Sequence, residues 1–158
     1  MDYKIVIPSY KRADILRERT IQMLMDYNIK MNKVYVFVVE EELNEYKKIL
    51  PNECNIIVGE VGINRQRDFI GNFFADGQAL VSFDDDIVGL HQLDIITEDK
   101  TEPVKDLETL IYNTFFKLNV HGLNLAGIYP VNNYYFMKEK ETTDLRFIIG
   151  QVKIYYNK

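Results

Sequence analysis

Hydrophobic and polar positions along the first ninety residues predict four strands that alternate with three helices. The strands are expected where short apolar, β-branched runs occur, at residues 4–7, 34–39, 55–58 and 79–83. The helices are expected where apolar residues recur every three to four positions, over residues 14–27, 41–50 and 63–74. Strand runs without a polar interruption are typical of parallel sheets that helices cover on both faces. The order therefore predicts an α/β fold with a Rossmann-like sheet of mostly parallel strands.

After Leu90 the pattern changes and predicts a short mixed α+β part. Residues 97–106 are polar and are expected to form a loop, and Pro103 suits the first turn of a helix that ends before Gly122. Further strands are expected over residues 125–129, 134–137 and 147–156. The last strand runs nearly to the final residue, which favours a longer natural protein. We expect one domain over residues 1–158, in two parts that meet at residue 90.

Composition narrows the class of protein. The 158 residues are 47% hydrophobic and 27% charged, which is typical of a globular chain. The net charge of -5 argues against a protein that coats nucleic acid, so any such contact must be local. A single cysteine, Cys54, excludes an internal disulfide and suits a reducing compartment. No apolar run approaches 18 residues, so we expect a cytoplasmic protein without a membrane span.

Three adjacent aspartates, Asp84 to Asp86, directly follow the fourth predicted strand. Unit charges ~4 Å apart repel by about 4 kcal/mol at an effective dielectric constant of about 20. A divalent cation relieves such repulsion, and strand-like geometry would point Asp84 and Asp86 the same way, toward one ion. Ligands of open parallel sheets bind at this end of the strands. The alternatives are a solvated turn, or Asp86 as the N-cap of a short helix.

Two other segments follow predicted strands and carry cations. The segment Gly62–Asp68 opens a helix with Arg65 and Arg67, and helix N-termini and guanidinium groups both bind anions. The two arginines diverge around the helix, so we do not expect both to touch one phosphate; a solvated helix face is the alternative. The loop Pro8–Arg12 offers an aromatic side chain and two cations to a nucleobase or phosphate, although polar surface loops are common.

Together these phrases resemble a known class of enzyme. "IPSYKR", an acidic end to the second strand, "GINRQRDFI" and "FDDDI" are similar to the GT-A glycosyltransferases, over roughly residues 4 to 90. In that class an Asp-x-Asp motif holds Mn²⁺ or Mg²⁺ on a nucleotide-diphosphate sugar, most often a UDP-sugar. These segments look most like the viral, phage and trypanosome branch, which includes base-J-like enzymes and glucosylates hydroxymethyl-pyrimidines in DNA. That branch implies DNA as the acceptor, and a host cell's cytoplasm or nucleus as the location.

The resemblance also implies roles for single residues. Asp84 and Asp86 match the outer carboxylates of the motif, as metal ligands, with Asp84 also able to reach the ribose. The remaining nucleotide-sugar-binding residues that it implies are Pro8, Ser9, Tyr10, Arg12, Glu40, Asn64, Arg65, Arg67 and Asp85. Residues 1–90 would form the donor half and residues 91–158 a short acceptor half. In the class, the general base often lies in that second half. Here Glu139, Glu141 and Asp144 are carboxylates of that half, but none of them stands in a motif, so no catalytic residue is assigned.

Two other functions stay open from the residues alone. One is a non-catalytic module that binds a nucleotide or a sugar, which turnover of a sugar nucleotide would distinguish from an enzyme. The other is a metal-dependent nucleotidyl or phosphoryl transferase, since carboxylate clusters also serve that chemistry. The sequence has no Walker A, GxGxxG or GxSxG pattern, which argues against P-loop, dinucleotide-binding and common hydrolase classes.

Overall fold

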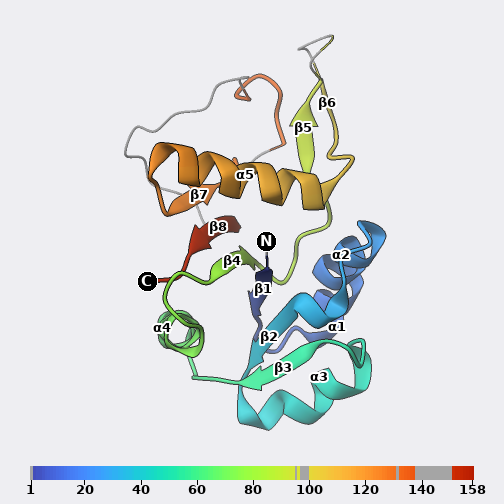
Figure 1. Cartoon of the computed structure of the whole chain (residues 1–158). Coiled ribbons are helices and arrows are strands. Elements are labelled where there is room, and N and C mark those ends of the chain that lie inside the picture. The colour runs from blue at the N-terminus through green and yellow to red at the C-terminus, as the bar shows by residue number, and fades with distance from the viewer. Residues whose placement is uncertain (1, 95, 97–99, 131, 138–150) are drawn as a thin grey trace.

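The computed structural model describes residues 2–94, 96, 100–130, 132–137 and 151–158. Within these residues, six strands form one sheet in the order β3-β2-β1-β4-β8-β7 (Figure 1). Their bounds are β1 Tyr3–Pro8, β2 Val34–Val38, β3 Asn55–Val58, β4 Ala79–Phe83, β7 Leu125–Gly127 and β8 Val152–Tyr156. The first four are parallel to one another, whereas β8 is antiparallel to both of its neighbours. The predicted α/β class and mostly parallel sheet are confirmed.

Helices cover both faces of this sheet. One face packs against α1 Ala13–Leu16, α2 Gln22–Asp26, α3 Leu43–Ile49 and α5 Leu107–His121, and the other against α4 Ile63–Phe73. Alternate strand residues divide between the two cores: Ile5 and Ile7 of β1 face the larger core, and Val6 faces α4. This burial on both sides explains why the strands read as continuous apolar runs.

The helix predicted over residues 14–27 contains a feature that periodicity does not reveal. Between α1 and α2 the chain forms one π-helical turn, η1 Arg17–Ile21. Two short 3-10 turns, η2 Met31–Lys33 and η3 Glu40–Glu42, precede β2 and α3. Otherwise the elements of the first ninety residues have the predicted type and order, with bounds within three residues of those expected.

The second part differs more from the prediction. Strands β5 His91–Leu93 and β6 Thr101–Pro103 pair as an antiparallel hairpin, and β6 lies within the segment 97–106 that was expected to be a loop. Pro103 ends β6 instead of opening the helix, since a two-stranded ribbon has only edge strands and tolerates proline there. Helix α5 begins at Leu107 because the Asp106 carboxylate caps it, accepting a 2.9 Å hydrogen bond from the Thr109 amide. Gly122 ends the helix in the left-handed conformation, as predicted.

The strand expected over residues 134–137 is wrong. Residues 134–136 form a turn, and Tyr135 is 75% exposed. The Asn133 side chain accepts a 3.0 Å hydrogen bond from the Tyr135 amide, which draws the backbone into a turn in place of an extended strand. Strand β8 confirms the later part of the strand expected over 147–156. The earlier part, with Glu139, Glu141 and Asp144, lies outside the described residues.

Candidate functional site at the carboxyl edge of the parallel strands

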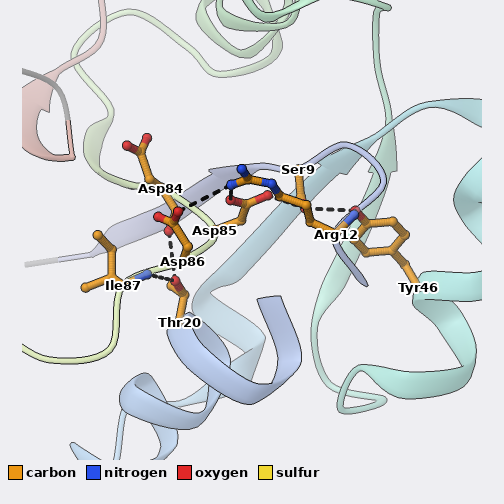
Figure 2. A network of polar contacts seen from close by, with 8 residues as sticks. All are labelled: Ser9, Arg12, Thr20, Tyr46, Asp84, Asp85, Asp86 and Ile87. Atoms are coloured by element: carbon orange, nitrogen blue, oxygen red, sulfur yellow. Dashed lines mark hydrogen bonds and ion pairs between the residues drawn. The ribbon is translucent and has the colours of Figure 1, made fainter. Parts of the chain in front are cut away.

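The loop after β1 and the aspartate triplet after β4 meet at the carboxyl edge of the sheet (Figure 2). They meet because β1 and β4 are adjacent parallel strands, with Val6 opposite Ser82. Helix α3, which follows β2, contributes Tyr46 to this cluster. Residues more than seventy positions apart in sequence are therefore in direct contact.

A closed ring of hydrogen bonds joins these elements. Ser9 Oγ donates to Asp85 Oδ2 at 2.8 Å, and Arg12 Nη1 donates to Asp85 Oδ1 at 3.0 Å. Because Ser9 has one hydroxyl proton and a carboxylate only accepts, Tyr46 Oη donates to Ser9 Oγ, 2.8 Å away. The Arg12 amide donates to Tyr46 Oη at 3.3 Å, which returns the ring to Arg12. Ser9, Tyr46 and Asp85 are all buried, so the ring fixes the loop to the triplet.

A second contact fixes the tip of the same loop. Lys11 has a left-handed backbone, with φ of 55°, and its amide donates to both carboxylate oxygens of Glu42, at 3.0 and 3.1 Å. Glu42 is buried at the end of η3. The Tyr10 side chain is exposed at the tip, with the Lys11 ammonium 5.1 Å from the centre of its ring. The side chains of Tyr10 and Lys11 are therefore accessible to a ligand, on a loop whose backbone is fixed by Glu42.

The π-helical turn positions Thr20 beneath the triplet. Thr20 Oγ1 donates to the Asp84 carbonyl at 2.8 Å and accepts from the Ile87 amide at 2.9 Å (Figure 2). Thr20 is fully buried, so its hydroxyl holds both ends of the triplet in place. Single π-helical turns occur frequently at functional sites, where they change the direction of a side chain.

The triplet itself is a turn, and its three carboxylates differ in their contacts. Strand β4 ends at Phe83, so Asp84 and Asp86 do not lie in a strand. The strand geometry that was expected to point both side chains the same way is therefore absent. Asp86 Oδ2 accepts from Arg12 Nη1 at 3.3 Å, whereas the Asp84 carboxylate points away from Arg12 (Figure 2). Burial raises the pKa of Asp84, as do the nearby Asp86 and Asp85, while Arg67 opposes this shift.

Arg67 brings the N-terminal part of α4 toward the triplet. Its charge lowers the pKa of Asp84, and it also lowers that of Tyr155, which burial raises. Near this helix start, the Gln66 side chain accepts a 2.6 Å hydrogen bond from the Glu60 amide and so holds the loop after β3. Asn64 and Arg65, in the first turn of α4, are exposed.

The predicted site residues thus fall into three groups. Ser9, Arg12, Asp85 and Asp86 are in direct contact, and Arg67 acts on Asp84 through its charge. Pro8 ends β1 and Tyr10 lies on the tethered loop. Glu40, Asn64 and Arg65 are exposed, and no described hydrogen bond joins them to the triplet. Their roles stay predictions.

Three residues of the cluster were not predicted from the sequence. Glu42 and Tyr46 lie one turn apart, in a segment that reads as a solvated, charged helix. The one aromatic residue in that charged segment was the available signal for Tyr46. Thr20 had no signal, because only the π-helical turn aims its hydroxyl at the triplet.

Comparison with known families identifies the class of enzyme. Residues 3–118, well over half of the chain, match the model of the TET-associated glycosyltransferase family. The chain belongs to this family. No curated protein matches the sequence.

The matched range of this TET-associated glycosyltransferase contains the whole candidate site. It spans β1 through β6 and most of α5, and so includes the loop after β1, the start of α4 and the aspartate triplet. The protein is a glycosyltransferase, as the resemblance implied. No helix in the described part of this transferase is long and apolar enough to cross a membrane.

Proposed function

We propose that this protein transfers a sugar from a nucleotide-diphosphate donor, for which we favour a UDP-sugar, to a hydroxyl group on a modified DNA base. The supporting observation is the assembly of carboxylates and arginines at the carboxyl edge of the parallel strands, where open α/β sheets bind ligands. The strand order and this edge are compatible with a GT-A enzyme of the Asp-x-Asp type. Family membership favours this function over the binding module and the phosphoryl transferase.

The carboxylate oxygens of the triplet that accept no described hydrogen bond suit a divalent ion whose remaining ligands come from a diphosphate. No described hydrogen bond reaches the Asp84 carboxylate, and Asp86 Oδ1 is also unbonded among the described residues. Mg²⁺ typically uses one or two carboxylates and completes its shell with phosphate oxygens and water. No described group of three His, Cys, Asp or Glu side chains could hold an ion on its own. Asp86, and Asp84 beside it, would hold Mn²⁺ or Mg²⁺ together with the donor.

In sugar transfer the acceptor oxygen bonds to the anomeric carbon, the bond from that carbon to the diphosphate breaks, and the hydroxyl proton passes to a general base, for which no residue is assigned. The leaving diphosphate gains negative charge, which nearby cations stabilise. Arg12 supplies positive charge to Asp85 and Asp86, and Arg67 supplies it to Asp84. A bound divalent ion would add Lewis-acid stabilisation of the same group. The loop Pro8–Arg12, with Tyr10 exposed, would border the nucleoside.

A modified base in DNA is the acceptor that best fits the family name. The branch that the sequence resembles glucosylates hydroxymethyl-pyrimidines in DNA, and the family is named for its association with TET. The net charge of -5 disfavours binding along a DNA backbone. The cations Lys11, Arg12, Arg65 and Arg67 are instead concentrated in two of the segments at the site edge, which suits local contact with a nucleic acid.

Thermal unfolding with UDP, UDP-glucose and GDP, each with and without Mn²⁺, tests the donor site. A ligand at 100 times its Kd stabilises the fold by about 2.7 kcal/mol. For a chain of this length that corresponds to a rise in Tm of roughly 5–10 °C. We expect the rise only when nucleotide and Mn²⁺ are both present, and we expect Asp86→Ala to remove it. Equal stabilisation of wild type and Asp86→Ala would refute the metal assignment. Transfer of labelled glucose to hydroxymethylated DNA, with unmodified DNA as control, then tests the acceptor.

A further inference from the structure

Arg12 bridges two carboxylates that differ in how tightly they are held. Its Nη1 donates to Asp85 Oδ1 at 3.0 Å and to Asp86 Oδ2 at 3.3 Å. The Asp85 side chain is only 10% exposed, whereas that of Asp86 is 40% exposed. Water screens the exposed pair more strongly, so the contact with Asp86 is the weaker of the two.

Asp85 is the fixed partner in this arrangement. Each of its oxygens already accepts a hydrogen bond, Oδ2 from Ser9 and Oδ1 from Arg12. Recruiting Asp85 to a ligand would break a buried bond and leave a charge or a hydroxyl without its partner. We therefore assign Asp85 to holding Arg12 in place, although sequence reasoning placed it among the donor-binding residues.

We propose that Arg12 is the resident counter-cation of Asp86, and that a divalent ion replaces it there when the sugar donor binds. This inference rests on the proposed function, since it requires a metal-dependent donor site. A divalent ion bound to Asp86, through its open Oδ1, would repel the nearby Arg12 guanidinium, so the hydrogen bond that Asp86 Oδ2 accepts would weaken. Asp85 retains the guanidinium through the exchange, so Arg12 stays at the edge of the site.

The exchange frees part of Arg12 for the donor. Losing Asp86 releases one N–H of Nη1, and no described residue accepts a hydrogen bond from Nε or Nη2. The Arg12 side chain is 48% exposed, so these donors are accessible. A guanidinium with free N–H groups binds phosphate oxygens well. Arg12 would thus compete with the metal ion for Asp86 in the free enzyme, and would donate hydrogen bonds to the diphosphate in the complex.

This dual role predicts opposite effects from one substitution. In Arg12→Gln, the free protein should bind Mn²⁺ about two- to five-fold more tightly, because Asp86 has lost its competing cation. At saturating Mn²⁺, the same variant should bind UDP about tenfold more weakly, because a charge-assisted hydrogen bond is gone. A residue that only supported the local structure would weaken both affinities together.

Calorimetric titration of wild type and Arg12→Gln with Mn²⁺ alone, and with UDP at saturating Mn²⁺, makes the comparison. Lys48→Gln, which removes an exposed positive charge at the far end of α3, controls for net charge and should leave both affinities unchanged. If Arg12→Gln fails to fold because Asp85 is left unpaired, Arg12→Gln with Asp85→Asn replaces the ion pair by a neutral amide pair. Asp85→Asn alone is then the reference, because it carries the same loss of negative charge, and relative to it the double variant should show the same opposite shifts.

The outcomes separate the two proposals. Mn²⁺ affinity that is unchanged or weaker in the Arg12 variants, with wild type binding both ligands, overturns the exchange and leaves the donor site standing. Wild type that binds neither Mn²⁺ nor UDP overturns the metal-dependent function and the exchange with it. Tighter Mn²⁺ binding with weaker UDP binding supports both.

Discussion

Replacing Ser9 by alanine removes the central link of the hydrogen-bonded ring. The Ser9 hydroxyl donates to the ionised Asp85 and accepts from Tyr46, and all three residues are buried. A hydrogen bond to a charged group contributes about 1.5–3 kcal/mol. The Tyr46 hydroxyl would also lose its acceptor in a place that water does not readily reach, so we expect Ser9→Ala to lower the free energy of unfolding by about 2–4 kcal/mol.

Urea unfolding followed by far-ultraviolet circular dichroism measures this loss, since the chain has no tryptophan to report by fluorescence. Ser82→Ala is the matched control: Ser82 lies on β4, and no described hydrogen bond involves its side chain. Its expected effect is within about 0.5 kcal/mol. An equally small effect for Ser9→Ala would refute the ring.

A double-mutant cycle with Tyr46→Phe tests whether the links act together. Contacting groups in one network show coupling energies of about 0.5–3 kcal/mol. Tyr46→Phe should therefore cost less in the Ser9→Ala background than in wild type, because the Tyr46 hydroxyl has already lost its acceptor there. Costs that simply add would show that Ser9 and Tyr46 stabilise the fold independently.

Two further predictions concern the elements around the site. Gly59→Ala should lower the free energy of unfolding by about 1 kcal/mol, because a Cβ there would displace the Gln66 carboxamide and break the hydrogen bond that it accepts from the Glu60 amide. The same urea titration checks it, and an unchanged midpoint would show that the carboxamide moves aside at no cost. Asp106→Ala should lower the Tm at pH 7 by removing the cap of α5. The hydrogen bonds from Thr109 lower the pKa of Asp106, so its stabilisation is present above the ordinary value of 3.8 and is lost as the pH falls below it. The Tm difference from wild type should therefore shrink in acid, and a difference that persists at pH 2 would contradict the capping role.

Several features of this protein follow from its sequence alone. Uninterrupted runs such as residues 34–39 can be buried on both faces only in a sheet that helices cover on both sides, so the class of fold was predictable. The placing of Asp84 and Arg67 after successive strands then predicted a shared edge, because parallel strands end on the same side. Gly122 marked the end of α5 because few other residues adopt its conformation without strain.

What each side chain does at that edge was decided by tertiary contacts. Three identical aspartates have identical local propensities, yet Asp85 is buried against Ser9 and Arg12 while Asp84 stays unbonded among the described residues. The three aspartates differ because of contacts with residues more than sixty positions away, and neither composition nor motif spacing predicts those contacts. The same holds for Thr20, whose hydroxyl reaches the triplet only because a π-helical turn redirects it. In the first ninety residues local periodicity determined which strands and helices form and roughly where they end, and packing between distant segments determined which of their polar groups are left free for chemistry.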